Sequence, residues 1–363
     1  MQLRRLWLTD FRGYREADVA FDPGLTAVLG PNGQGKTNLL EAIGYLATLS
    51  SFRGAPTEAL VRSGADRAVV RAEAEREGRE LLLEAELVAN GRNRTQLNKQ
   101  PLRRARDLLG ALRVTVFSPD DLTLVKGSPG DRRGYLDETL VSLHPRYDEM
   151  RSDLDRVLRQ RGALLKQAGG RLTPEIELTL DVFDAKLVTA GEALASARRN
   201  LVAALEPLLG AAYDAVAQRA AEVRATYDPP WMDGGLAAAL VASRRDDLRR
   251  GVSTVGPHRD ELELVIGGLP SRTHASQGEQ RSLALALRLA AHHVVTEQTD
   301  SSPVLLLDDV FSELDPDRSD ALLRSLPPGQ TVLSTASGLP PGAVPGAVIE
   351  VRDGVATPGS RRG

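Results

Sequence analysis

The chain has 363 residues, of which 42% are hydrophobic, with 46 Lys plus Arg against 49 Asp plus Glu and a formal net charge of −3. This length and composition predict a large buried core arranged as two lobes rather than as one compact unit. The slightly negative charge excludes a protein that coats polyanions over its whole surface, so a nucleic-acid contact must come from a local basic patch.

The chain contains no cysteine, which excludes disulfides, thiolate metal sites and a cysteine nucleophile and fits a reducing compartment. The apolar segment after Arg4 and Arg5 stops at Thr9 and Asp10, which is too short for a signal peptide. No uncharged run of about 18 residues occurs elsewhere, which excludes a membrane-spanning helix. We therefore expect a cytoplasmic protein that has no membrane partner.

Residues 1–29 alternate in the manner of three strands, at 3–8, 17–21 and 25–29. Between the first two strands lies the turn Phe11-Arg12-Gly13-Tyr14. An arginine in such a turn is either solvated or close enough to reach the edge of a bound nucleotide, and both interpretations of Arg12 stay open.

The third strand leads into a glycine-rich loop that fits G-x-x-x-x-G-K-[ST], and an apolar helical pattern follows it. The glycines let consecutive backbone N–H groups turn toward phosphate oxygens, while the helix directs the positive end of its dipole at them. Lys36 would neutralise the outer phosphates, and Thr37 would bring a hydroxyl to Mg²⁺. We expect the phosphates of a nucleotide to bind Gly30, Pro31, Asn32, Gly33, Gln34, Gly35, Lys36, Thr37 and Asn38.

Apolar and charged residues alternate at 68–75 and 80–88 around Glu77-Gly78, which predicts an antiparallel sheet. The segment that follows is much more basic than the chain average. A run of positive charge is either a solvated surface or a contact for a polyanion such as DNA, and the pattern alone does not choose between them. The candidate DNA patch consists of Arg92, Arg94, Lys99, Arg103, Arg104 and Arg106.

Helical patterns dominate residues 128–250. Ser128 before Pro129 is typical of a helix start, and apolar residues at heptad spacing then form two limbs around Gly169-Gly170. His144-Pro145 divides the first limb into two helices, and the second limb is expected to end at Pro207. The pattern indicates a short coiled-coil hairpin, although the same stripes are also compatible with the core of a helical bundle.

The remaining motifs lie in the last third of the chain. Ser276-Gln277-Gly278-Glu279-Gln280 precedes an apolar helix, so its serine and N–H groups form a second helix N-terminus suited to an anion. The apolar run at 304–307 ends in Asp308 and Asp309, as expected for a buried parallel strand that delivers a carboxylate to Mg²⁺. A further strand is expected at 331–335, and the tail at 358–363 is expected to be disordered.

The order of these motifs resembles the ATP-binding-cassette ATPases, specifically their chromosome-maintenance branch. The motifs are the phosphate loop, a helical insertion, S-Q-G-E-Q at 276–280 and L-L-L-D-D-V-F-S-E-L-D at 305–315. F-R-G-Y at 11–14, F-S-P-D-D-L at 117–122 and G-P-H-R-D at 256–260 are similar to the RecF family. SMC proteins, by contrast, have arms of hundreds of residues.

The resemblance implies an α/β fold: an ATPase head with a mixed sheet behind the phosphate loop, an antiparallel β-subdomain and an inserted all-α lobe. We expect the two parts of the head at 1–127 and 251–357 and the helical lobe at 128–250. The implied function is ATP-dependent DNA binding in recombinational repair, at gapped DNA or junctions of single- and double-stranded DNA. The implied partners are duplex DNA, RecR, RecO and RecA.

The resemblance also assigns residues. It implies that Lys36 and Thr37 bind ATP and Mg²⁺, that Asp308 holds Mg²⁺, and that Lys36, Asp308 and Asp309 are catalytic. Ser276, Gln277 and Gly278 would form a signature that closes over the ATP of a second copy, and Asp315 would lie in the loop between subunits of an ATP-dependent homodimer.

The sequence departs from the family pattern at three positions. One departure points to slow hydrolysis, and the other two leave open how the γ-phosphate is sensed. Asp309 stands where these ATPases usually have glutamate, so the attacking water would be held less well. No glutamine follows Phe117, and the strand at 331–335 has no histidine to sense the γ-phosphate. His258 is either such a sensor or a structural residue.

Two other functions remain possible from the sequence. A transporter ATPase subunit would share the phosphate loop and the paired carboxylates but should lack the heptad hairpin. A nucleotide-gated DNA clamp, in which ATP binding does the work and turnover is incidental, is compatible with Asp309.

Overall fold

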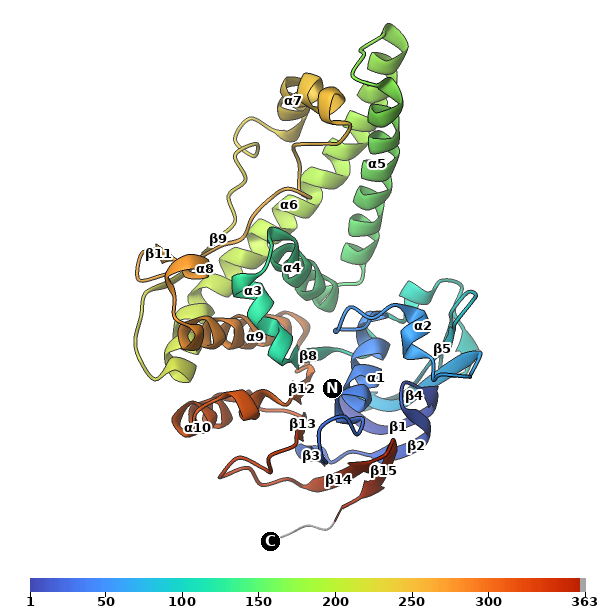
Figure 1. The fold of residues 1–363 in the computed structure, drawn as a ribbon, viewed down its shortest axis with the longest axis vertical. Helices are drawn as coiled ribbons and strands as arrows, with labels where there is room; N and C mark the ends of the chain where they lie inside the picture. Colours follow the sequence, from blue (N-terminus) through green and yellow to red (C-terminus); the bar gives the residue numbers. More distant parts are fainter. Residues whose placement is uncertain (360–363) are drawn as a thin grey trace. The chain divides into compact units, whose positions relative to one another are not determined.

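The computed structural model describes residues 1–359, and residues 360–363, most of the tail expected to be disordered, lie outside the described residues. The chain forms two compact units (Figure 1). The first unit comprises Met1–Leu122, Leu208–Ala221 and the chain from Ser276 onward. The second unit comprises Thr123–Pro207 and Glu222–Ala275. Within the described residues, no helix is both long and apolar enough to cross a membrane.

The first unit contains an antiparallel sheet in the strand order β2-β1-β4-β5-β6-β7. Alternating side chains of its central strands are buried, because one face of the sheet covers the core. Short helices α2 (Thr57–Leu60) and η1 (Ala105–Leu108) belong to the same region. The strands are β1 (Gln2–Phe11), β2 (Tyr14–Ala20), β4 (Arg67–Arg76), β5 (Arg79–Val88), β6 (Arg94–Leu97) and β7 (Gln100–Pro101).

A second sheet of the first unit has the order β15-β14-β3-β13-β12-β8, and all its neighbouring pairs are parallel except β14 with β15. The strands β12 and β13 are buried along their whole length, which explains the apolar run of β12, whereas β13 has serine and threonine around Val332 and Leu333. The strands are β3 (Leu25–Leu29), β8 (Val114–Phe117), β12 (Val304–Asp308), β13 (Thr331–Thr335), β14 (Ala347–Arg352) and β15 (Val355–Pro358). Pro358, expected in the disordered tail, ends β15.

Helices of the first unit pack on these sheets. Helix α1 (Lys36–Thr48) contacts strands of both sheets, and most of its side chains are buried. Helix α9 (Gln277–Thr299) contacts β8, and Leu285 and Leu289 join the core with Phe117 and Leu307. Three short elements complete the unit: η2 (Pro119–Leu122), η3 (Val310–Glu313) and α10 (Pro316–Ser325).

The second unit is mainly helical. Helices α5 and α6 form the expected hairpin, with Gly169 capping α5 in a left-handed conformation. At its tip, Leu165, Leu180 and Leu248 form one cluster, so α7 adds a third helix and the apolar stripes there form a bundle core. The elements are α3 (Thr123–Lys126), α4 (Pro129–Leu143), α5 (Arg146–Ala168), α6 (Pro174–Ala217), β9 (Val223–Thr226), α7 (Leu236–Arg250), β10 (Glu263–Ile266), β11 (Leu269–Pro270) and α8 (Ser271–His274).

Helix α6 runs through Pro207, and the expectation that it would end there is wrong. A proline inside a helix removes one backbone hydrogen bond and crowds the preceding turn, and the burial of Leu205 and Leu209, on either side of it in sequence, offsets that cost. This continuity also explains why the unit boundaries differ from the expected 128 and 250. The chain returns to the first unit from Leu208, and the segment Glu222–Ala275 with its small sheet belongs to the helical unit.

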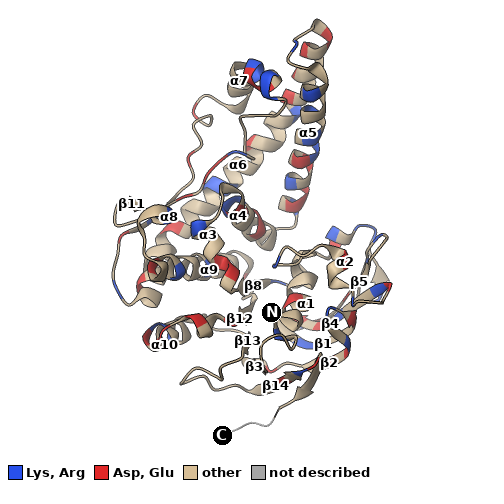
Figure 2. Ribbon diagram, viewed as in Figure 1, with Lys and Arg blue, Asp and Glu red and all other residues tan. Residues whose placement is uncertain are grey.

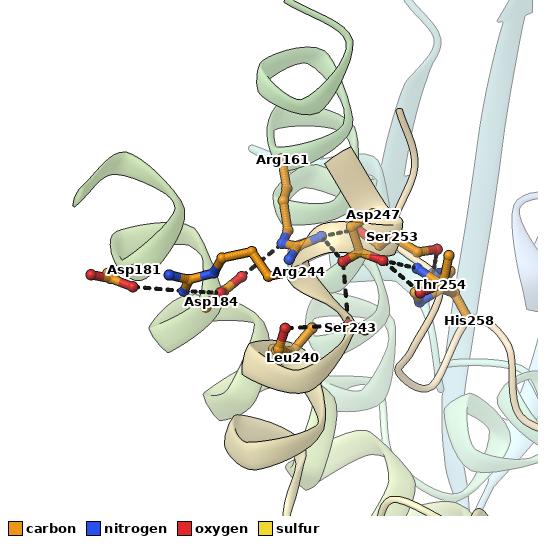
Figure 3. Close-up of polar contacts among 10 residues, drawn as sticks. All are labelled: Arg161, Asp181, Asp184, Leu240, Ser243, Arg244, Asp247, Ser253, Thr254 and His258. Carbon is orange, nitrogen blue, oxygen red and sulfur yellow. Dashed lines mark hydrogen bonds and ion pairs between the residues drawn. The ribbon is translucent and has the colours of Figure 1, made fainter. Parts of the chain in front are cut away.

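Buried ion pairs join α5, α6 and α7 (Figure 3). The guanidinium of Arg161 is fully buried and donates to Asp184 and to Asp247, each at 2.7 Å. Asp184 also accepts a hydrogen bond from Arg244, and Asp247 accepts one from the backbone N–H of Thr254. The three helices are therefore held in one register by directional contacts as well as by apolar packing.

Candidate nucleotide-binding site

The phosphate loop connects β3 to α1, and its lysine is folded onto the loop itself. Lys36 is 6% exposed, and its ammonium donates to the carbonyl oxygens of Gly30 and Pro31 at 2.8 and 2.9 Å. Burial lowers the pKa of Lys36, and the negative charges of Asp309 and Asp308 partly offset this effect. The amine thus lies inside the loop, close to the two carboxylates that the sequence assigned to the same site.

Strand β12 brings Asp308 to the start of α1. The hydroxyl of Thr37 donates to Asp308 Oδ1 at 2.9 Å, and the hydroxyl of Ser334 donates to the same oxygen at 2.7 Å. Ser334 lies opposite Asp308 in the parallel register of β12 and β13. Burial raises the pKa of Asp308, while these two hydrogen bonds act in the opposite direction.

Asp309 follows directly and has a left-handed backbone conformation, with φ of 49°. Its backbone N–H donates to the carbonyl oxygen and the hydroxyl of Ser334, at 3.1 and 3.2 Å. Its Oδ1 is buried and has no hydrogen-bond partner in the described part of the chain. A buried carboxylate oxygen without a donor is costly, so this position suits a bound water or a hydrated cation.

The residues present fit Mg²⁺ bound together with a nucleotide. Mg²⁺ usually keeps several waters and takes one or two carboxylates together with phosphate oxygens. The Thr37 hydroxyl and the Asp308 carboxylate offer that incomplete set of oxygen ligands. Among the described residues no group of three or more His, Cys, Asp or Glu could hold a metal by itself, so the remaining ligands would have to come from phosphate and water.

Arg12 lies in the β1–β2 turn and makes an ion pair within the first unit. Its guanidinium donates to both oxygens of Glu41 at 2.7 Å and to the carbonyl oxygen of Ala59 at 2.9 Å. Glu41 is on α1 and fully buried. Arg12 therefore anchors α1 to the turn, and its contact with a nucleotide stays a prediction.

Two residues that act on the carboxylates, Ser334 and Arg53, are not among the predicted site residues. Ser334 has no recognisable signal, because only the register of β12 and β13 brings it to Asp308. Arg53 is exposed in the loop after α1, and its positive charge is among the influences that lower the pKa of Asp308, after the hydrogen bonds from Ser334 and Thr37. The arginine in Ser51-Phe52-Arg53-Gly54, soon after the phosphate-loop helix, could have drawn attention to it.

The signature segment lies at the start of α9. Ser276 caps the helix, accepting a hydrogen bond from the Glu279 N–H at 3.3 Å, and its own N–H donates to the Glu279 carboxylate at 2.8 Å. Gln277 is exposed. A Cβ at Gly278 would lie 2.4 Å from a guanidinium nitrogen of Arg318, so glycine leaves room for that arginine.

Asp315 is connected to the signature segment through the same arginine. It caps α10 by accepting a hydrogen bond from the Arg318 N–H at 2.9 Å, and the Arg318 side chain lies 3.5 Å from its carboxylate. The structure thus brings Gly278 and Asp315 to Arg318, with Ser276 at the start of the same helix as Gly278, and it groups Lys36, Thr37, Asp308 and Asp309 at the phosphate loop. No hydrogen bond within the described residues joins the two groups.

The candidate DNA patch runs from the residues just before β6 through β7 to η1, and Figure 2 shows the Lys, Arg, Asp and Glu residues of the described part of the chain. Arg92, Arg94, Lys99, Arg103 and Arg104 are exposed, and Arg106 is half-buried. Acidic residues lie among them, because Arg104 pairs with Asp107 at 3.0 Å and Arg94 lies opposite Glu86 in the sheet. DNA binding by this patch stays a prediction.

His258 belongs to the second unit, where its neighbours are structural. Its Nε2 lies 3.0 Å from the carbonyl oxygen of Ser253, and burial lowers its pKa (Figure 3). In the same motif, Asp260 accepts hydrogen bonds from Tyr227 at 2.6 Å and from Trp231 at 2.8 Å. These contacts support the structural interpretation of G-P-H-R-D.

Comparison with known proteins identifies the family. Residues 2–331 match the RecF/RecN/SMC N terminal domain family. The chain is 45% identical over 353 residues to the DNA replication and repair protein RecF of Streptomyces avermitilis, covering 93% of this chain and 94% of that one. It is 47% identical over 354 residues to the protein of the same name from Frankia alni, covering 93% of each chain.

Solved structures agree. The fold matches that of the recombination mediator protein RecF-ATP in the RecFOR pathway with a TM-score of 0.91 and 28% identity, covering 99% of this chain and 98% of that chain. An Smc head bound to the C-winged helix domain of ScpA matches at a TM-score of 0.58 and 19% identity, which supports the fold alone. The predicted α/β ATPase head with an antiparallel subdomain and a helical lobe is confirmed, and the transporter interpretation is set aside. The chain belongs to the RecF family.

Proposed function

We propose that this protein binds ATP and Mg²⁺ at the phosphate loop and uses them to control DNA binding in recombinational repair. One observation carries the proposal. The Thr37 hydroxyl and the Asp308 carboxylate are hydrogen-bonded beside a buried oxygen of Asp309 that has no donor in the described residues. The solved relative is named RecF-ATP, and the relatives from Streptomyces and Frankia are named DNA replication and repair proteins.

Each residue of the loop has a role in this proposal. The backbone N–H groups between Gly30 and Asn38, other than Pro31, which has none, receive the phosphates. Lys36 exchanges its bonds to the loop carbonyls for bonds to the outer phosphate oxygens. Thr37 and Asp308 hold Mg²⁺, which when bound neutralises charge on those oxygens. Arg12 acts at the nucleotide edge or, through Glu41, on the position of α1.

Asp309 orients the attacking water in this proposal and accepts its proton. Its side chain is one methylene shorter than that of glutamate, so it holds the water less well and hydrolysis is weak. In this proposal DNA stimulates the hydrolysis, and its role is regulatory. The same residue favours a second candidate function, a DNA clamp gated by ATP binding alone. In that case turnover is incidental and does not respond to DNA.

ATP binding also assembles the active form in this proposal. Ser276, Gln277 and Gly278 of one copy close over the ATP held by the phosphate loop of another copy, and Asp315 lies at the junction. The observation that supports this step is that no hydrogen bond within the described residues joins the two groups, while the signature segment bonds to Glu279 and contacts Arg318. The product is an ATP-dependent homodimer.

The proposed cellular role is supported by the names of the relatives, which refer to DNA replication and repair and to the RecFOR pathway. The dimer binds gapped DNA, junctions of single- and double-stranded DNA, or duplex DNA, with Arg92, Arg94, Lys99, Arg103, Arg104 and Arg106 as candidate contacts. RecR is the direct protein partner, with RecO and RecA in the same pathway. The absence of cysteine fits action in the reducing cytoplasm.

One set of measurements tests the proposal. ATP binding is titrated with and without Mg²⁺, and DNA affinity is measured with and without ATP. ATP turnover is then measured alone, with gapped DNA and with the matching intact duplex. Tight Mg²⁺-dependent ATP binding with DNA-stimulated turnover supports the ATPase, and ATP-dependent DNA binding with unstimulated turnover supports the clamp. If ATP does not bind, or if it leaves DNA affinity unchanged, the proposal is wrong.

A further inference from the structure

The turn between β14 and β15 touches the phosphate loop, although the two segments lie at opposite ends of the chain. The N–H of Asp353 donates to Gln34 Oε1 at 2.5 Å, and the N–H of Gly354 donates to the Gln34 carbonyl oxygen at 3.3 Å. Gln34 is the fifth residue of the loop, and its side chain is thus engaged with the turn. A single residue of the loop accepts two hydrogen bonds from this hairpin.

The same hairpin limits the loop at a second point. A Cβ at Gly30 would lie 2.2 Å from the carbonyl oxygen of Val351, the residue before the last of β14. The start of the loop therefore lies directly against the β14 backbone. Any displacement of the hairpin toward the loop would meet Gly30, and any displacement away from it would break the bonds to Gln34.

The turn is itself held from the other side. A Cβ at Gly354 would lie 2.3 Å from the carbonyl oxygen of Gly13, in the β1–β2 turn. Tyr14 of that turn donates to the Gly35 carbonyl oxygen at 2.9 Å. The phosphate loop therefore lies in a frame of two hairpin turns, and Gln34 and Gly35 are bonded to one turn each.

We propose that the β14–β15 turn is a positioning element that holds the phosphate loop in its anion-binding conformation before nucleotide arrives, with Gln34 as the positioning residue. The inference rests on the proposed function of the loop. A loop with glycine at 30, 33 and 35 is free to adopt many conformations, and ordering it on binding would weaken affinity. If the contacts with the turn already order the loop when the protein folds, nucleotide binding no longer carries the entropic cost of ordering it.

Linkage gives the proposal a reciprocal consequence. If the turn stabilises the binding conformation of the loop, a bound nucleotide must stabilise the turn to the same extent. Hydrogen exchange at the Asp353 and Gly354 amides should therefore slow when ATP binds, although in this proposal the turn supplies no ligand to the nucleotide. A purely structural turn would exchange at the same rate with and without ATP.

The β4–β5 turn offers a matched control for mutagenesis. Gly354 follows Asp353 with φ of 71° and 48°, and Gly78 follows Glu77 with φ of 75° and 53°. Alanine is strained to the same extent at both glycines. A Cβ at Gly78 meets nothing within 4 Å, whereas a Cβ at Gly354 meets Gly13, so only Gly354→Ala pushes its turn out of place.

The experiment compares wild type, Gly354→Ala, Gly78→Ala and Gln34→Met by ATP titration and by hydrogen exchange without nucleotide. We expect Gly354→Ala to weaken ATP and ADP binding by about tenfold and to speed exchange in the loop at 33–37. Gln34→Met, which keeps the length of the side chain but removes its oxygen, should weaken binding by about fivefold and abolish the ATP effect on Asp353 exchange. Gly78→Ala should change neither.

The outcomes are distinguishable. If wild type does not bind ATP, the proposed function fails. If wild type binds ATP and Gln34→Met binds it equally well, with Asp353 exchange still responding to ATP, the positioning inference is overturned. Gln34→Met also decides the matter should Gly354→Ala fail to fold, because it leaves the hairpin sequence unchanged.

Discussion

The hydroxyl of Thr37 donates to Asp308 Oδ1 at 2.9 Å across 271 positions of sequence. This bond connects the first turn of α1 to the end of β12, with Ser334 of the neighbouring strand on the same oxygen. A metal ion at this point would be shared by two segments whose positions are fixed by different parts of the sheet. The arrangement makes the site sensitive to single substitutions in either segment.

Lys36→Met should weaken ATP binding severely while leaving the fold intact. Among the described residues, the ammonium bonds only to carbonyl oxygens of its own loop, and methionine keeps most of the apolar stem of the side chain. Charge-assisted bonds to phosphate are among the stronger polar contacts, and methionine cannot make them. Equilibrium titration with ATP measures the loss, and circular dichroism checks the fold. Affinity close to wild type would contradict the role assigned to the loop.

Asp308→Asn should separate stability from turnover. Burial raises the pKa of Asp308, so its contribution to the stability of the fold is fully present below the unfolded pKa and is lost as pH rises through the folded pKa. Asparagine suffers no such loss and can still accept the bonds from Thr37 and Ser334. Without Mg²⁺, the variant should match wild type in unfolding free energy near about pH 4 and exceed it near about pH 7.

The same variant should bind nucleotide but lose Mg²⁺-dependent turnover, because one charge of the metal site is removed. Asp66→Asn, at an exposed aspartate of the same unit, is the charge-matched control and should change neither property. Normal turnover by Asp308→Asn would move the metal site elsewhere.

Arg161→Met should destabilise the helical unit by about 3–5 kcal/mol, because it leaves Asp184 and Asp247 buried with fewer partners. Arg156→Met, on the same helix but in an exposed pair with Asp153, is the control and should have little effect. Urea unfolding followed by Trp231 fluorescence, in a background where Trp7 is replaced by Phe, reports on this unit alone. Equal midpoints for the two variants would contradict the prediction.

The DNA patch is testable through salt. DNA affinity should fall linearly with salt concentration on logarithmic axes. Arg103→Ala with Arg104→Ala should flatten the slope by up to about 0.9 unit for each phosphate of duplex DNA that the two arginines neutralise. The control is the pair Arg5→Ala and Arg71→Ala, which removes two cations of the same sheet that bond to Asp18 and Glu84. An unchanged slope in the patch variant would mean that these arginines are only solvated.

The site residues that could be predicted are those that belong to short local sequence patterns. Lys36 and Thr37 follow from loop spacing, and Asp308 follows from an apolar run that ends in a carboxylate. Ser334 could not be predicted, because only the pairing of two parallel strands sets it opposite Asp308. Nor could the contact of Gln34 with Asp353, which depends on where the last hairpin of the sheet folds back.

The fold, like the site, has features that local sequence patterns predict and features that only tertiary packing decides. The strands and the helical hairpin were readable from periodicity, because each buries one face or one stripe. Pro207 was misread as a helix end because its local preference is overridden by the packing of Leu205 and Leu209. Arg12 had two interpretations in the sequence, and its partner Glu41 became evident only with the position of α1.

The last prediction concerns assembly. Two helix N-termini suited to anions exist in one chain, one at Lys36 and one at Ser276, and no hydrogen bond within the described residues joins them. If a second copy supplies the missing half, ATP should shift monomer toward dimer by its differential affinity for the two states. ADP, which lacks the γ-phosphate that the signature would contact, should not. Sedimentation velocity with each nucleotide measures the shift.

Ser276→Arg tests whether Ser276 of one copy lies against the ATP of another copy. Ser276→Ala, which loses only the helix cap, is the control. Ser276→Ala and Ser276→Arg both remove the hydroxyl that accepts the Glu279 N–H, a loss of about 1 kcal/mol in helix stability. Only arginine adds bulk and charge where the partner's Mg²⁺-bound nucleotide would lie. We expect both variants to bind one ATP per chain, Ser276→Ala to dimerise, and Ser276→Arg to stay monomeric and to lose ATP-dependent DNA binding. Dimerisation of Ser276→Arg with ATP would show that Ser276 is not part of a shared site, and the proposed arrangement of the ATP-dependent homodimer would then be wrong.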